Sequence, residues 1–189
     1  MLLNKKFFDK DTVKVAKALL GKIIRYKNCS GMIVETEAYK GFPDKASHAA
    51  KRTKRSAIMF DTYGTFYIYF VYGNYFCMNI TTEKAKPGAV LIRALEPLNG
   101  IKTMAKRRGI KTKRTDNKAL LTLTNGPGKL CRAFAITKKL NNTKINDKIK
   151  IIDNKKKFDI VQTTRIGIEK AKHLPWRFYI KDNKFVSKK

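Results

Sequence analysis

Two glutamates, Glu35 and Glu37, are the residues of this sequence best suited to acid–base chemistry, because they lie two positions apart in a very basic chain. They belong to the stretch from Gly31 to Tyr39, which reads Gly-Met-Ile-Val-Glu-Thr-Glu-Ala-Tyr. Its alternation predicts a half-buried β-strand, whose successive side chains point to opposite faces. One face then carries Ile33, Glu35, Glu37 and Tyr39, and the other carries Val34, Thr36 and Ala38.

The chemistry open to such a pair is proton abstraction from water. On one strand face the two carboxylates would lie roughly 7 Å apart, close enough to affect each other's ionisation. A carboxylate held there can act as a general base. The alternative is a solvated edge strand whose acids bond to nearby lysines.

The charge of the chain predicts the class of its partner. Its 189 residues, 43% of them hydrophobic, suffice for one domain with a real core. Lys and Arg number 43 against 14 Asp and Glu, a net charge of +29, which favours a polyanion such as nucleic acid. Codon bias in an AT-rich genome also raises lysine content, and ribosomal proteins are as basic. The charge therefore indicates a class of partner rather than a role.

The spacing of the cysteines and histidines predicts no structural zinc site. Cys29, Cys77 and Cys131 lie far apart, and the only histidines are His48 and His173. An odd cysteine count without a secretory signal fits a reducing compartment, and no apolar run is long enough to span a membrane. We expect a cytoplasmic protein, associated with the nucleoid if the source is bacterial.

The segments around the acidic strand predict an α/β fold of the α+β type, a single domain with a mainly antiparallel sheet and short helices. A helix capped by Asp9 or Asp11 runs to Leu20, and a strand at 22–26 pairs with the acidic strand. Later segments are a loop at 40–56, an aromatic hairpin at 66–81, an apolar strand at 89–95, a helix opening at 125–130, a strand at 149–152 and a hairpin of 177–180 with 185–187.

The aromatic hairpin sorts into two faces if its loop has three residues. Placing that loop at 73–75 pairs Tyr69 with Asn79. One face is then a good core, and the other, which would lie beside the glutamates, carries Tyr67, Tyr69, Val71, Cys77, Asn79 and Thr81. Tyr72 lies at the tip, where an exposed ring is hard to explain as core.

Three cations have candidate partners. Arg93 lies within an apolar strand and needs a carboxylate or phosphate, and Glu35 is the obvious candidate. Asn-Gly-Pro-Gly at 125–128 opens a helix whose amino terminus, with Lys129 and Arg132, could hold a backbone phosphate. Glycine and proline are also common before helices that bind no phosphate.

A basic surface, an aromatic pocket face, a protruding tyrosine and one acidic pair together suggest an enzyme acting on an extruded nucleobase. Phosphates need Lys and Arg, a flipped base needs rings, and the vacated duplex needs a wedge. At these residues the chain resembles the alkyladenine (3-methyladenine) DNA glycosylase family. The shared motifs are Ile-Val-Glu-Thr-Glu-Ala-Tyr at 33–39, Tyr-Ile-Tyr at 67–69, Cys-Met-Asn at 77–79, Arg-Ala-Leu-Glu-Pro at 93–97, Asn-Gly-Pro-Gly-Lys-Leu at 125–130 and Arg-Phe-Tyr at 177–179.

The resemblance implies a role for each matching residue. Glu37 would activate the water that cleaves the N-glycosidic bond, and Tyr72 would intercalate. The flipped base would be enclosed by Tyr39, His48 and Tyr69 and screened by Asn79, and Arg93 would line the pocket floor or hold DNA. The family implies double-stranded DNA with damaged purines as substrate, no metal and no cofactor.

Other interpretations stay open. Because water is the nucleophile and no lysine stands out as an amine nucleophile, we expect a monofunctional glycosylase that leaves the abasic site intact. A monomer is the default state for a protein that scans a duplex. The alternatives are a non-catalytic nucleic-acid-binding protein and a catalytically silent damage sensor. Arg93 is as readily a structural partner of Glu35 as a ligand contact, and Tyr67 reads as packing.

Overall fold

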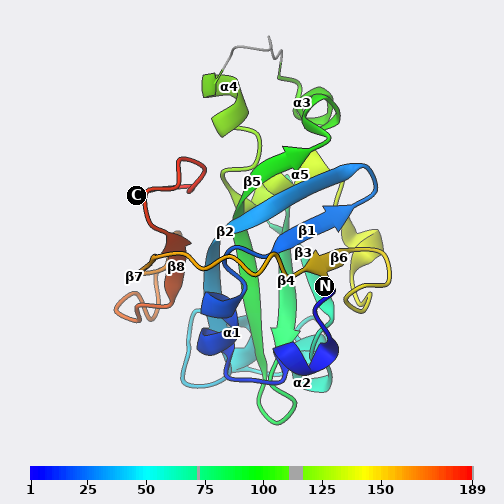
Figure 1. Cartoon of the computed structure of the whole chain (residues 1–189). Helices are drawn as coiled ribbons and strands as arrows, with labels where there is room; N and C mark the ends of the chain where they lie inside the picture. The colour runs from blue at the N-terminus through cyan, green and yellow to red at the C-terminus, as the bar shows by residue number, and fades with distance from the viewer. Residues whose placement is uncertain (72, 111–116, 189) are drawn as a thin grey trace.

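The fold is built on one antiparallel sheet, seen in a computed structural model that describes residues 1–71, 73–110 and 117–188 (Figure 1). The strands are β1 Ile23–Tyr26, β2 Cys29–Lys40, β3 Phe66–Val71, β4 Tyr75–Thr82, β5 Gly88–Asn99, β6 Lys150–Ile152, β7 Ile160–Thr163 and β8 Arg177–Ile180. The helices are α1 Thr12–Ala18, α2 Ala57–Asp61, α3 Ile101–Arg108, α4 Asn117–Leu121 and α5 Pro127–Phe134, with short 3-10 turns η1 Lys5–Phe8, η2 His48–Ala50 and η3 Lys138–Leu140. The predicted fold class is confirmed.

The acidic strand β2 lies at the centre of the sheet. The strand order is β3-β4-β5-β2-β1-β6, and β8 pairs with β2 and with β7. β2 is therefore bonded to β5 along one side and to β1 and β8 along the other, and the edge-strand alternative is wrong.

The two faces of the sheet have different roles. The main core packs α1 and α5 against one face and includes Ile68, Met78 and Ile92. Thr36 on that face donates from its hydroxyl to the carbonyl of Ala16 in α1, at 2.9 Å. A smaller cluster of Ala49, Met59, Tyr67 and Ala89, with Tyr69 beside it, covers the other face. The glutamates of β2 lie on the side of this smaller cluster.

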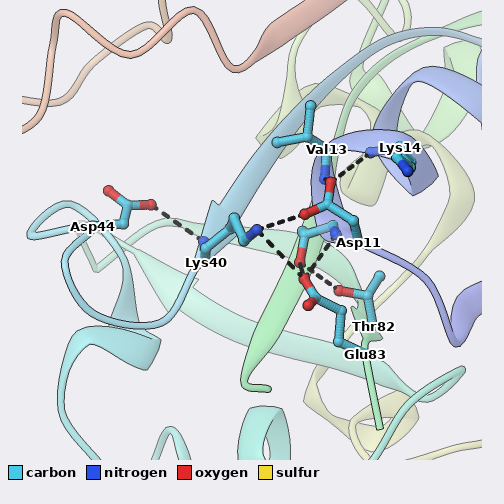
Figure 2. Close-up of polar contacts among 8 residues, drawn as sticks. Asp11, Val13, Lys14, Lys40, Asp44, Thr82 and Glu83 are labelled. Carbon is cyan, nitrogen blue, oxygen red and sulfur yellow. Dashed lines mark hydrogen bonds and ion pairs between the residues drawn. The ribbon is translucent and has the colours of Figure 1, made fainter. Parts of the chain in front are cut away.

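Helix α1 begins where the sequence predicts it. The carboxylate of Asp11 accepts from the backbone N–H groups of Val13 (3.0 Å) and Lys14 (3.1 Å), as an N-cap does. Figure 2 shows Lys40, at the end of β2, donating to Asp11 and lying 3.9 Å from Glu83. The helix ends at Ala18, however, and not at Leu20 as predicted.

The aromatic hairpin has the predicted faces but not the predicted register. Tyr69 pairs with Cys77 rather than Asn79, and the last pair is Val71 with Tyr75, so the register differs from the prediction by two residues. A shift of two residues preserves the alternation, which is why the face assignment stands.

The predicted C-terminal hairpin is wrong. β8 pairs with β7, which was not predicted, and residues 185–187 form no strand. The backbone N–H of Ser187 instead donates to the Glu35 carboxylate at 2.7 Å. Such charge-assisted hydrogen bonds are stronger than the neutral ones of a strand pair, so this one bond helps to hold the segment in place.

Candidate active site

The glutamates of β2 form the buried centre of the site. Glu35 and Glu37 are both 0% exposed. The register of β2 against β5 shifts between Ile33 and Glu35, which marks a bulge. Ile33 packs into the main core and does not share the face of the two glutamates, so its predicted placement is wrong.

Glu37 is held by donors on both oxygens. Oε1 accepts from the backbone N–H of Ile166 at 2.8 Å, and Oε2 accepts from the Tyr39 hydroxyl at 2.8 Å. The guanidinium Nη1 of Arg93 lies 3.3 Å from Oε2. The carboxylate is therefore fixed by three different parts of the chain.

Glu35 is occupied by a different set of groups. Its Oε1 accepts from Nη1 of Arg177 at 2.8 Å, and its Oε2 accepts from the N–H of Ser187. Arg93 lies 3.4 Å from Oε1, so the expected pairing with Glu35 is present, but Arg177 is the closer partner. The negative charges of the two buried carboxylates are thus matched by the positive charges of Arg93 and Arg177, and Arg93 lies between the two glutamates.

An aromatic pocket opens beside this charged centre. It is lined by Tyr39, Ala46, His48, Met59, Tyr67, Tyr69, Asn79 and Ala89 and has a volume of about 30 Å³. The expected residues Tyr39, His48, Tyr69 and Asn79 are thus brought together. Glu37 lies behind this lining, one hydrogen bond from it through Tyr39.

Three rings form one wall of the pocket. Tyr67 and Tyr69 lie with ring centroids 5.2 Å apart, and His48 meets Tyr69 edge-on at 4.7 Å. Nδ1 of His48 is 2.9 Å from the Tyr67 hydroxyl. Tyr67 therefore packs in the smaller cluster, as predicted, and in addition lines the pocket and contacts His48. Asn79 is held as well, because its Nδ2 donates to the carbonyl of Tyr67 at 3.0 Å.

The surroundings favour uncharged rings. Partial burial, followed by the positive charge of Arg55, lowers the pKa of His48. Burial, followed by the negative charge of Glu37, raises the pKa of Tyr39, and burial also raises that of Tyr69. At neutral pH the pocket therefore presents neutral rings with intact hydroxyl donors.

The two predicted phosphate contacts lie outside the pocket. Lys129 donates to Oδ1 of Asn125 at 2.9 Å, and exposed Arg132 donates to the carbonyl of Arg107 at 3.0 Å. Burial, and then the nearby charge of Arg108, lowers the pKa of Lys129. Lys129 and Arg108 line a hollow with Val71 and Tyr75, so they flank the outer end of the hairpin. Tyr72 lies outside the described residues.

Sequence reasoning missed the groups that come from far along the chain. Arg165 makes a two-pronged ion pair with Asp44, and its neighbour Ile166 supplies the N–H on Glu37. Arg177 was noted only as part of a motif. No spacing rule could have found these partners, because they lie more than a hundred residues from the acids that they contact.

Within residues 1–71, 73–110 and 117–188, no group of three or more His, Cys, Asp or Glu is placed to hold a metal ion. None of the helices in this part of the chain has the length and apolarity needed to cross a membrane.

Comparison with known proteins identifies close relatives. The family model for methylpurine-DNA glycosylase matches residues 6–184. A protein of Clostridium novyi named "Putative 3-methyladenine DNA glycosylase" is 48% identical over 99% of this chain and 98% of its own length. A protein of the same name from Clostridium perfringens is 48% identical over 100% of this chain and 100% of its own length. Another from Desulfitobacterium hafniense is 43% identical over 99% of this chain and 98% of its own length.

Proposed function

The chain belongs to the methylpurine-DNA glycosylase family and is a DNA glycosylase, and from that premise we propose that it hydrolyses the N-glycosidic bond of alkylated or deaminated purines in duplex DNA. The observation that carries the proposal is the position of Glu37, which is buried directly behind an aromatic pocket and bonded to one of its rings. A carboxylate in this position can act on a nucleobase bound in the pocket while the carboxylate itself stays shielded from bulk water.

Glu37 is the general base of the proposed reaction. An ionised carboxylate has about four lone-pair sites. Ile166 uses one on Oε1, Tyr39 uses one on Oε2, and Arg93 faces Oε2 as well. The second lone pair of Oε1 stays available for a proton of the attacking water. Water adds to the sugar carbon as the glycosidic bond breaks, the bonding electrons leave with the purine, and Glu37 takes the proton.

The pocket selects bases that stack well. Purines alkylated at N3 or N7 are cationic, so they are good leaving groups and are attracted to the electron-rich faces of Tyr39 and Tyr69. A neutral His48 adds no positive charge to oppose them. Asn79, fixed by its bond to Tyr67, would screen against the 2-amino group of guanine. Deaminated purines are neutral and need a proton as they leave, and we assign no acid for that step.

DNA would be held around this pocket. The target purine must leave the stack to reach buried groups, so base flipping is part of the proposal, with Tyr72 as the wedge. Lys129 and Arg132 are the proposed phosphate contacts. With water as nucleophile, the enzyme is monofunctional and the product is an abasic site in an intact strand.

The test compares wild type with Glu37→Gln on duplexes containing ethenoadenine or hypoxanthine and on methylated DNA. We expect free base from the wild type and a rate lower by about 10²–10⁴-fold in the variant, the usual contribution of a general base. Binding of damaged duplex should persist, because Gln keeps the size of the side chain. Equal excision by the two proteins would remove Glu37 from this role, and no release from any substrate, with binding intact, would favour a silent damage sensor.

A further inference from the structure

The segment that follows β7 brings a main-chain donor to the proposed base. Residues 164–168 have no regular secondary structure, yet the N–H of Ile166 lies 2.8 Å from Oε1 of Glu37. Irregular surface segments are usually the mobile parts of a protein. A donor that must hold one lone pair of a carboxylate in place needs an anchor nearby.

Arg165 is that anchor. From Ile160 to Trp176 it is the one buried residue, and its side chain is 0% exposed. Its Nη1 donates to the carbonyl of Ala38 at 3.0 Å and to Oδ2 of Asp44 at 2.7 Å, and its Nη2 donates to Oδ1 of Asp44 at 2.7 Å. The guanidinium also lies 4.6 Å from the ring centre of Tyr39. It thus touches β2 at Ala38 and Tyr39, the two residues that follow Glu37.

Asp44 is equally well fixed. It is 0% exposed, and its carboxylate accepts from the backbone N–H groups of Lys40 and Ala46, each at 3.2 Å. Figure 2 shows the first of these bonds, at the end of β2. The Asp44 carbonyl accepts from the N–H of Ser47, the residue before His48. The ion pair therefore joins the Ile166 donor, the acidic strand and the start of the His48 turn.

Stability alone is a weak reason for this pair. A buried ion pair loses hydration that its attraction only partly repays, and apolar replacements of similar volume are often as stable. Here Nε of Arg165 is also buried without a hydrogen-bond partner. The arrangement is easier to understand if its geometry serves the neighbouring Glu37.

We infer that Asp44 and Arg165 are positioning residues for the glycosylase reaction, which fix the Ile166 N–H on Oε1 of Glu37 so that the remaining lone pair keeps one direction toward the attacking water. The inference rests on the proposed function. It assigns no contact with DNA or base to either residue. Loosening the pair should lower the rate of bond cleavage and leave binding of the damaged duplex unchanged.

The experiment measures excision under single-turnover conditions, together with Kd for the same damaged duplex and Tm, for Asp44→Asn and Arg165→Lys. Asp153→Asn is the matched control, because it weakens a 2.8 Å pair with Lys22 that does not touch Glu37 or its partners. We expect the excision rate to fall by about 10- to 100-fold in both variants, the scale of a small misplacement of a catalytic group. Kd should stay within about twofold, and the double variant should lose no more than either single one, because the two residues act as a unit.

Ile166→Pro is the second variant, because it removes the N–H itself and leaves the side chains of the Asp44–Arg165 pair unchanged in type. It should show the same loss of rate, and it decides the question if the ion-pair variants fail to fold. A rate like that of Asp153→Asn in the folded variants, or a rise in Kd that accounts for the loss, would overturn the inference. Wild type and Glu37→Gln in the same assay separate this outcome from a failure of the proposed function, in which wild type itself releases no base.

Discussion

Replacing Glu35 should damage stability, whereas replacing Glu37 should damage chemistry. In Glu35→Gln, Arg177 loses a carboxylate partner at 2.8 Å. Both groups are buried, because the Arg177 side chain is 6% exposed and the Glu35 side chain is 0% exposed. Removing one partner of a buried pair costs about 3–5 kcal/mol, and Gln can still accept from Ser187, so we expect about 3 kcal/mol. For a chain of this size that lowers Tm by about 6–12 °C.

Glu37→Gln should cost much less. Its nearest cation, Arg93, lies at 3.3 Å and keeps Glu35 as a second partner. The Gln oxygen can still accept from the N–H of Ile166, and the Gln NH2 group can donate to the Tyr39 hydroxyl, which is able to accept. We expect about 1 kcal/mol, typical of one hydrogen bond. Active-site groups are often replaced without loss of stability.

The assay is urea unfolding followed by circular dichroism and by the fluorescence of Trp176, the one tryptophan in the sequence. The same preparations are used for single-turnover excision well below both midpoints. Equal destabilisation by the two variants would refute the division of roles, and so would an excision rate of Glu35→Gln as low as that of Glu37→Gln.

Three further predictions concern the pocket and the DNA surface. Tyr67→Phe removes the contact with His48 but keeps the ring, so preference for damaged over undamaged duplex should fall by about fivefold, the equivalent of about 1 kcal/mol, in competition binding; an unchanged preference would argue against orientation of His48 by Tyr67. Because the pKa of His48 is lowered in the folded protein, the unfolded chain binds a proton at His48 at a higher pH than the folded chain does, so stability should fall as the pH drops below about 6.5. His48→Gln should make the fall in Tm between pH 7.5 and 5 smaller. Identical plots of Tm against pH for wild type and variant would contradict this prediction. Lys129→Gln and Arg132→Gln should each lower the slope of log K against log salt by about 1 with undamaged duplex, and a slope equal to that of wild type would show that the side chain meets no phosphate.

The sequence predicts the local features of this protein well because they depend on neighbours in the chain. The cap at Asp11 and the two faces of the aromatic hairpin follow from short-range rules and are confirmed. The hairpin register was off by two residues, since alternation fixes only whether a position is odd or even. The bulge that sends Ile33 into the core has no sequence signal of its own.

The pocket could be predicted better than the groups behind it. Tyr39, Tyr69 and Asn79 lie on strands whose faces can be read from the sequence, whereas His48, in the η2 turn, was expected only from the family resemblance. Three of the groups that hold the acids come from residues 166–187, namely Arg177 and the backbone N–H groups of Ile166 and Ser187. Backbone donors carry no residue type, so no pattern could point to them.

The placement of the Ile166 donor has a consequence for the heat tolerance of activity. Arg165 is the one buried residue of 160–176, and Trp176 is the one partly buried residue there that packs against the main core, so opening of this stretch requires less free energy than unfolding of that core. Such an opening withdraws one donor from Glu37 while β2 and β5 stay paired. We therefore expect catalysis to fail on warming before the fold does, and amide exchange at Ile166 to report the temperature at which it fails.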